Sequence, residues 1–500
     1  MQLIRKARKD SFAHTSKLQK LETGKSGRSK KFIKDVGIYA IGNIGSKLIT
    51  FLMIPFYTFF IDSSDFGYYD LCLQAVLLLL PFATLQLRDG VFRFLVDCRT
   101  DEERSGVIGL SIKIISTVLL LFFLLTIGLS IATTIRYAWY TFGFLVAISL
   151  HEVFGQMARG LNHTKVFMLS NILSAFFIGI FSIIFVAVFN LGIEGIFLAN
   201  ILARLVAVAY IEFTVGPCHK FFKLSYRNHK LRNDLLRYSL PLLPGAICWW
   251  LTNGSDRFFI EHFLSLSDNG IYAVAFRFSS ILQILSTIFY QAWQDTAYRQ
   301  FDSDDRDRFF SEMFNNYIHA LALILLCFAF GLKLVYPWIV APEYQEGANY
   351  LYPMGVASIL YAASAFLEVE YQCARETARA LPGIITAAAV NIILNYFLIQ
   401  AVGIYGVVIT AVITYVVLLV CRLFDMRRYF KLSFHARSLF PIAISVIGLI
   451  PFYWSTIWWL DIAYSLTALT ILAMAMPPAF RNRLSARILR RNRPQNASGK

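Results

Sequence analysis

Charged residues and cysteines are scarce in this chain. Of its 500 residues, 16% are charged and only 7 are cysteine, whereas 57% are hydrophobic. The mean hydropathy is +0.57. This composition excludes an ordinary soluble domain, in which about a quarter of the residues are charged. All the cysteines lie in apolar segments or basic connections, so we expect no disulfide.

Signatures of catalysis are missing as well. Gly24-Lys25-Ser26 lacks the upstream glycine of a P-loop, so ATP hydrolysis is not expected. Asp302-Ser303-Asp304 matches the D-x-D pattern of some metal sites, but its charged surroundings favour a solvated acidic turn. Histidines and cysteines show no metal-ligand spacing. We therefore expect no catalytic residue, no metal site and no cofactor.

Apolar segments are what the sequence has in abundance. They recur along nearly the whole chain, and at about 18 to 25 residues each can cross about 30 Å of hydrocarbon as a helix. The sequence predicts an all-α polytopic membrane protein with about fourteen transmembrane helices. These lie near residues 36–61, 68–87, 107–132, 137–158, 166–189, 193–215, 238–260, 270–294, 314–340, 350–371, 380–401, 404–422, 436–455 and 458–477.

The net charge of +16 is distributed unevenly. Every second connection and both termini are rich in Lys and Arg. The remaining connections are mainly acidic, with Arg136 as their only clear cation; their acids are Asp62, Asp65, Glu261, Asp268, Glu343, Glu346 and Asp461. By the positive-inside rule both termini are cytoplasmic, which requires an even number of spans. The charge thus predicts orientation in the membrane, with contact to anionic lipids as the weaker alternative, and not binding to nucleic acid.

Three short motifs recur in the same order and indicate a duplication. The octapeptide Glu-Val-Phe-Gly-Gln-Met-Ala-Arg at 152–159 returns at 368–375 as Glu-Val-Glu-Tyr-Gln-Cys-Ala-Arg. Likewise, 64–69 pairs with 267–272, and 192–195 with 403–406. Six predicted spans separate the copies, so we expect two parallel six-helix bundles related by a pseudo-twofold axis along the membrane normal.

The predicted organisation follows from the repeat and the charge. Its parts are a basic cytoplasmic tail (1–35), an N-terminal six-helix bundle (36–215), a cytoplasmic linker (216–236), a C-terminal six-helix bundle (237–424), two additional transmembrane helices (425–480) and a second basic tail (481–500). Ser64-Asp65 and Ser267-Asp268 are expected to cap spans two and eight. Gly192 and Gly403 suit tight turns.

Polar residues inside the predicted spans indicate a ligand site. A charge at mid-bilayer costs about 2.5–3.5 kcal/mol on insertion scales, so it should face a bundle interior or a wet cavity. Lys47, Arg257 and Arg277 would make a cleft between the bundles cationic, which favours an anionic ligand such as a diphosphate. The candidate substrate-binding residues are Asn43, Lys47, Gln74, Arg257, Arg277 and Gln291. The alternative is that Arg257 only pairs with Asp256 or Asn253, and that Lys47 extends to the membrane surface.

Intramembrane carboxylates are candidates for coupling to H⁺ or Na⁺, because burial favours reversible protonation near neutral pH. These candidates are Asp256, Asp295, Glu212, Glu368 and Glu370, and the sequence does not single one out. Arg159 and Arg375 end the repeated octapeptides. They could bind lipid phosphate or hold the two bundles together as a cytoplasmic gate, but plain anchoring at the interface is favoured.

The opening of the chain resembles a known family. Asp35 through Pro55, with Asn43 and Lys47, followed by Ser64 through Asp70, is similar to the start of the polysaccharide-biosynthesis flippases. These are the O-antigen and exopolysaccharide repeat-unit translocases of the multidrug/oligosaccharidyl-lipid/polysaccharide exporter superfamily. The segments 391–395 and 403–406 also look like that family. The two terminal helices match its longer members and the lipid II flippases.

The resemblance implies alternating access between two six-helix bundles. It implies an undecaprenyl-diphosphate-linked oligosaccharide as cargo, moved from the inner to the outer leaflet of the bacterial inner membrane, with cation coupling. Membrane lipids, a polysaccharide polymerase and glycosyltransferases are the candidate partners. A drug/cation antiporter and a lipid II flippase are alternatives, although the cations count against the antiporter. A membrane polymerase or acyltransferase is less favoured because the outer connections are short.

Overall fold

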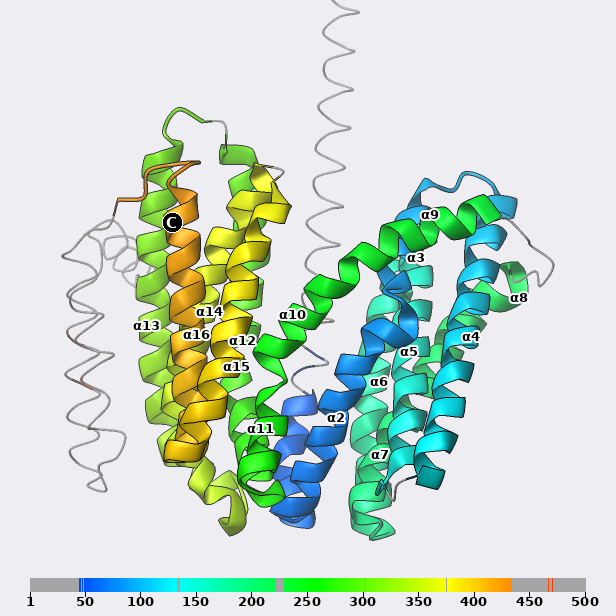
Figure 1. The fold of residues 1–500 in the computed structure, drawn as a ribbon, viewed down its shortest axis with the longest axis horizontal. Helices are drawn as coiled ribbons and strands as arrows, with labels where there is room; N and C mark the ends of the chain where they lie inside the picture. Colours follow the sequence, from blue (N-terminus) through cyan, green and yellow to red (C-terminus); the bar gives the residue numbers. More distant parts are fainter. Residues whose placement is uncertain are drawn as a thin grey trace, which may run out of the picture.

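The protein is represented by a computed structural model that describes residues 49–132, 135–221, 229–301, 303–374 and 376–433, with residues 45, 47, 466 and 470. The elements assigned in these residues are helices (Figure 1). Ten described helices are long and apolar enough to cross a membrane, and a shorter apolar helix covers Ile49–Phe60. The chain is therefore a multi-pass, all-α membrane protein, as its hydropathy predicts.

The first bundle precedes residue 222. After Ile49–Phe60 come α2 (Ser63–Thr84), α3 (Leu87–Asp97), α4 (Asp101–Ala132), α5 (Ala138–Gly160), α6 (Thr164–Ser182), a π-helical turn (Ile183–Val188), α7 (Gly192–Thr214) and α8 (Pro217–Phe221). Helix α5 packs against both α3 and α7, and α6 packs along α7. This bundle lies on the right in Figure 1.

The second bundle lies on the left in Figure 1. It contains α11 (Asp256–Phe263), α12 (Leu266–Gln300), α13 (Arg306–Ile339), a 3-10 turn (Pro342–Gly347), α14 (Ala348–Cys373), a 3-10 turn (Thr377–Arg379), α15 (Ala380–Val402) and α16 (Ile404–Met426). Helix α14 packs against α12 and α16, and α15 packs along α16.

An oblique helical segment links the two bundles. Helices α9 (His229–Ser239) and α10 (Leu243–Asn253) are joined by a 3-10 turn, Leu240–Leu242, that contains Pro241. Proline lacks a backbone N–H, so it fits the start of a helix, where that N–H would have no partner within the helix. Helix α9 packs on α3 of the first bundle, and α10 packs on α15 of the second.

The seventh predicted span is interrupted. Instead of one helix near 238–260, α10 ends at Asn253 and α11 begins at Asp256. A Cβ added at Gly254 would meet the side chains of Trp250 and Gln74, so the break is closely packed. The first predicted span is described from Ile49 onward, and those near 436–455 and 458–477 lie outside the described residues. The total of fourteen therefore stays a prediction.

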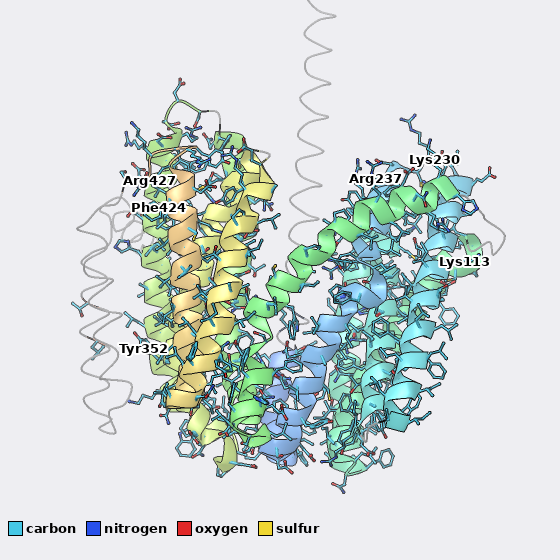
Figure 2. The ribbon with its side chains drawn as sticks, viewed as in Figure 1. Lys113, Lys230, Arg237, Tyr352, Phe424 and Arg427 are labelled. Carbon is cyan, nitrogen blue, oxygen red and sulfur yellow. The ribbon has the colours of Figure 1, made fainter. Side chains whose placement is uncertain are left out.

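The two ends of the molecule differ. In Figure 2, Lys230, Arg237 and Arg427 lie at the upper end, where the ribbons of the bundles diverge. At the opposite end α2 and α12 pack closely through the repeated motifs. A Cβ at Gly67 would overlap the carbonyl oxygen of Leu266, and one at Gly270 would overlap that of Ser63. The duplicated glycines are thus the points at which the backbones of the two bundles touch.

The helix caps near this contact begin two residues earlier than the sequence suggests. Asp62 caps α2 by accepting from the N–H of Asp65, and Ser265 caps α12 by accepting from the N–H of Asp268. The predicted caps are therefore in the first turns and not at the cap positions. Gly192 and Gly403 have φ of +56° and +62°, which explains glycine at both turns.

Candidate functional site

A large cavity lies between the first bundle and α12. Its volume is about 650 Å³, within the range of about 300–1,000 Å³ that ligand sites in proteins have. Its polar and charged lining residues are Lys47, Thr50, Tyr57, Tyr69, His151, Glu152, Asn171, Ser174, Asn200, Arg204, Arg277, Ser280 and Gln283. The cavity therefore draws on helices of both bundles, because α12 belongs to the second.

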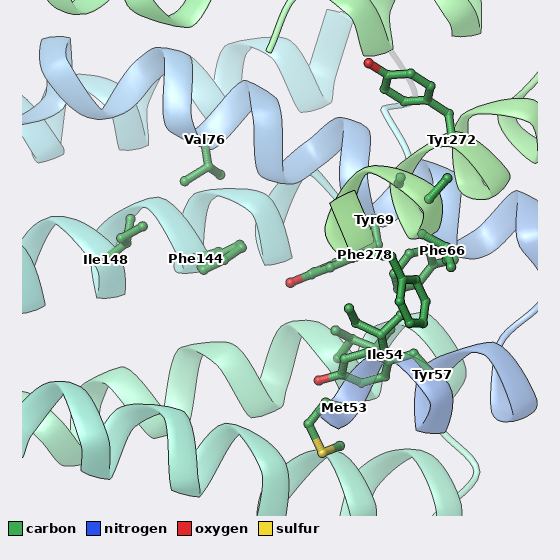
Figure 3. Close-up of a cluster of buried hydrophobic side chains, with 14 of the residues drawn as sticks. Met53, Ile54, Tyr57, Phe66, Tyr69, Val76, Phe144, Ile148, Tyr272 and Phe278 are labelled. Carbon is green, nitrogen blue, oxygen red and sulfur yellow. The ribbon is translucent and has the colours of Figure 1, made fainter. Parts of the chain in front are cut away.

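Part of the wall belongs to the largest buried cluster of apolar side chains. Figure 3 shows Ile54, Tyr57, Tyr69 and Ile148 of the wall together with Phe278 of α12. The Tyr57 hydroxyl is hydrogen-bonded to that of Ser182 at 2.8 Å. This packing holds the residues around the cavity in fixed positions.

Three cations reach the cavity from separate segments: Lys47 from just before the helix Ile49–Phe60, Arg204 from α7 and Arg277 from α12. In the described part of the chain, Arg204 donates to the carbonyl and side-chain oxygens of Asn200 (3.1 and 2.8 Å) and not to a carboxylate. Its guanidinium also lies 4.8 Å from the ring centre of Phe144. These contacts orient the guanidinium without neutralising its charge.

Arg277 is part of a buried ion network. Its guanidinium donates to Asp70 of α2 at 3.1 Å, and Arg257 approaches the other oxygen of the same carboxylate at 3.4 Å. Arg257 is also 4.0 Å from Asp256. The Arg277 side chain is 19% exposed, whereas that of Arg257 is 1% exposed. Arg277 can therefore face a ligand, while Arg257 serves as an internal partner.

Asp256 lies in a second polar network, in the second bundle. Its carboxylate accepts from the Asn395 amide at 2.7 Å and from the Tyr272 hydroxyl at 3.0 Å. Asn395 also donates to Asn391 at 3.2 Å, and Asn391 donates to Thr414 at 3.5 Å. The network is rich in oxygen atoms and holds one carboxylate.

The other candidate carboxylates are dispersed. Glu212 accepts from the backbone N–H groups of Cys218 and His219, so it caps α8 outside the cavity. Burial, and next the Glu212 carboxylate, raise the pKa of the Cys218 thiol to about 12. Glu368 pairs with Arg422 at 3.0 Å. Glu370 is fully buried, and its oxygens have no hydrogen-bond partner among the described residues.

The predicted site residues are thus separated by the structure. Lys47 and Arg277 line the same cavity, but Gln74 and Arg257 lie outside its lining. Gln74 is buried, and its backbone carbonyl oxygen accepts from the Trp250 indole N–H. Arg159 lies 4.3 Å from the ring centre of Phe92 and not on the cavity wall. Asn43 and Arg375, and the side chains of Gln291 and Asp295, are outside the described residues.

Sequence reasoning missed Arg204, Asp70 and Asn395. Arg204 lies in the middle of an apolar span, which was the available signal for an intramembrane charge. Asp70 directly follows the repeated motif at 64–69, so by sequence it is interpreted as part of that motif and not as an intramembrane charge. Asn395 is four residues from Asn391 and so on the same helical face, but only the fold brings that face to Asp256.

Two helical bundles with a charged cavity between them define the class as a polytopic α-helical membrane protein. The polysaccharide biosynthesis protein family matches residues 32–294, which is more than half of the chain. The chain therefore belongs to this family.

Solved structures agree with this fold. The lipid II flippase MurJ in an inward closed conformation is similar with a TM-score of 0.67 and 13% identity, covering 89% of this chain and 99% of that one. An inward-facing MATE family multidrug resistance transporter of the MOP superfamily is similar with a TM-score of 0.63 and 14% identity. The match covers 77% of this chain and 95% of that one. A MOP superfamily transporter from Pyrococcus furiosus is similar with a TM-score of 0.53 and 14% identity, and the match covers 78% of this chain and 94% of that one. Comparison with curated proteins finds no match. The family match and these structural similarities together place the chain in the polysaccharide biosynthesis protein family, with the fold of these solved structures.

Proposed function

We propose that this protein flips an undecaprenyl-diphosphate-linked oligosaccharide, a repeat unit of O-antigen or exopolysaccharide, to the outer leaflet of the bacterial inner membrane. The observation that carries the proposal is the cavity that Lys47, Arg204 and Arg277 line together. Two phosphate groups need several donors at once, and arginine presents a planar set of them. The polyprenyl chain would remain in the lipid while the headgroup enters the cavity.

Orientation and direction are part of the same proposal. The basic end, with both termini, would face the cytoplasm by the positive-inside rule. The ribbons diverge at this end and α2 meets α12 at the other, which suits loading from the cytoplasmic side (Figure 1). Separation of α2 from α12 would then release the headgroup outside.

Coupling to H⁺ or Na⁺ is proposed at Asp256. Of the five candidate carboxylates it is the one that the described structure places in a neutral polar network, where it accepts from the Asn395 amide and the Tyr272 hydroxyl. A buried carboxylate suits a proton, and its oxygen atoms are of the kind that bind a hard cation such as Na⁺. Arg257, 4.0 Å away, links this carboxylate through Asp70 to Arg277 on the cavity wall.

Substitution of the cavity cations tests the flippase. Lys47→Ala and Arg204→Ala should each lower glycan export by about 10- to 100-fold, the equivalent of a charge-assisted hydrogen bond. The measurement is surface glycan in cells that lack the native protein, with the lipid-linked precursor in the inner leaflet as the second readout.

Lys113→Ala is the matched control. Lys113 is exposed on α4 and lies at the outer right side of Figure 2, away from the cavity. It should export like the wild type at equal membrane abundance. Full export by both cavity variants would refute the proposed site. A drug/cation antiporter would instead show loss of drug resistance with glycan export intact.

A further inference from the structure

A second, smaller cavity lies within the second bundle and is unlike the first. Its volume is about 270 Å³, and its walls come from α12, α13 and α14. Its lining residues are Gln283, Ser286, Thr287, Phe289, Tyr290, Tyr317, Tyr361, Ala362, Ala365, Phe366 and Glu368. Among these described residues there is no lysine or arginine, so the cationic character of the first cavity ends here.

Flat aromatic rings form one part of this wall. Phe289 and Tyr317 are stacked, with ring centres 3.9 Å apart and planes 9° from parallel. Tyr317 also stacks near Phe366, at 5.7 Å and 27°. These rings make this part of the wall apolar and hold it in a fixed shape, which suits the C–H groups of a sugar ring.

Neutral hydrogen-bonding groups form the rest. Gln283, Ser286, Thr287 and the tyrosines can donate and accept, as a polyhydroxylated ligand requires. Glu368 is the only acidic residue in the described lining, and Arg422 pairs with it at 3.0 Å. The Arg422 side chain is 4% exposed and does not belong to the cavity lining. It therefore balances the charge of the carboxylate without facing the cavity. A cation would therefore find no net charge to bind.

One face of α12 connects the two cavities. Arg277 and Ser280 line the first cavity, Thr287 and Tyr290 line the second, and Gln283 lines both. The spacing of three or four residues places these side chains along one stripe of the helix. At about 1.5 Å per residue, the stripe from Arg277 to Tyr290 spans about 20 Å.

We propose that the second cavity binds a neutral sugar ring of the ligand whose diphosphate occupies the first. The proposal rests on the proposed function, because the diphosphate is what places the sugar beside Gln283. The first cavity holds the charge common to all such lipids. The second cavity binds the sugar and so distinguishes lipids that carry different glycans.

Binding of two related probes to the purified full-length protein tests this site. The probes are farnesyl diphosphate and farnesyl-diphospho-N-acetylglucosamine. The second carries a sugar in place of one ionisable phosphate oxygen, so the sugar contact is measured by how each variant changes the ratio of the two affinities. The wild type should bind the sugar-bearing probe about tenfold more tightly. Ala365→Phe fills the second cavity and Thr287→Val removes a hydroxyl from its wall. Both should reduce this preference, with the affinity for farnesyl diphosphate unchanged.

Two further variants separate the cavities. Arg204→Ala should weaken both probes by the same factor. Leu285→Phe, on the same helix at a position 44% exposed, should preserve the wild-type preference. Tight binding of farnesyl diphosphate with no gain from the sugar, or a gain that survives Ala365→Phe, would overturn the glycan site and leave the flippase proposal standing. Failure of both probes to bind the wild type would overturn both.

Discussion

Arg204 and Arg277 line one cavity, but the positive charge of each is balanced by neighbouring carboxylates to a different degree. Arg277 shares Asp70 with Arg257, so part of its charge is already balanced. Arg204 donates to the neutral side chain of Asn200, and Glu152, which lines the same cavity, acts on it with no hydrogen bond or ion pair between the two in the described part of the chain. Breaking a buried pair costs roughly 3–5 kcal/mol because a charge is left without a partner. Arg277 thus belongs to a structural ion pair as well as to the proposed site, which makes Lys47 and Arg204 the cleaner sites for substitution.

Asp256 leads to a prediction about the thermal stability of the protein in different ions. An ion that binds only the folded protein stabilises it by mass action. The wild type should therefore show a higher Tm in Na⁺ than in K⁺, or a Tm that shifts between pH 6 and pH 8 if the ion is H⁺. Asp256→Asn should abolish this response, as measured by thermal unfolding in detergent.

Glu212→Gln is the control for Asp256. It changes a carboxylate that caps α8 and lies away from the Asn391–Asn395 pair, so the ion response should remain. An ion response that persists in Asp256→Asn and disappears in Glu368→Gln would place coupling elsewhere.

At the scale of elements, the crossing of α2 and α12 depends on two glycines. Each comes from the same position of the repeat, and a methyl group on either would overlap a carbonyl oxygen of the other helix. Asn269 of α12 strengthens the contact by donating to the Gly67 carbonyl at 2.7 Å. Small residues permit such close approach of membrane helices. The glycine of this duplicated motif thus serves the packing between the two bundles.

Gly67→Ala should force this crossing apart. A cysteine at the buried position Ser63, in a chain without its native cysteines, should then react faster with a membrane-impermeant maleimide added outside cells. Gly128→Ala is the control, because a Cβ there meets no atom within 4 Å. Equal labelling of the two variants would show that the glycine contact does not keep the bundles together.

At the scale of the whole molecule, the bundles meet through a polar cluster beside the glycines. The hydroxyl of Ser63 is hydrogen-bonded to Ser267 and to Glu343 of the 3-10 turn before α14. The Tyr344 hydroxyl donates to the Ile61 carbonyl at 2.9 Å. If transport requires these ends to separate, a covalent link between them must stop it.

Ser63→Cys with Ser267→Cys provides that link. Under oxidising conditions the double variant should lose glycan export, and a reductant should restore it, with each single variant active throughout. Gel mobility with and without reductant measures the cross-link, and surface glycan measures export. Export by the fully cross-linked protein would contradict separation of α2 and α12.

The sequence by itself determined the membrane class, the all-helical fold and the repeat. These follow from local properties: an apolar segment in a bilayer must satisfy its own backbone hydrogen bonds and therefore forms a helix. Gly192 and Gly403 were predictable for the same reason, since a positive φ at a turn is a local requirement.

Only the tertiary structure decided which charges meet. Arg257 is as conspicuous in the sequence as Arg277, but Asp70 and the break at Gly254 bury it away from the cavity. Arg204 joins Lys47 because α7 faces the first helix across the bundle. Charge at a site is a sum over side chains from different helices, and that sum depends on packing between segments far apart in the chain.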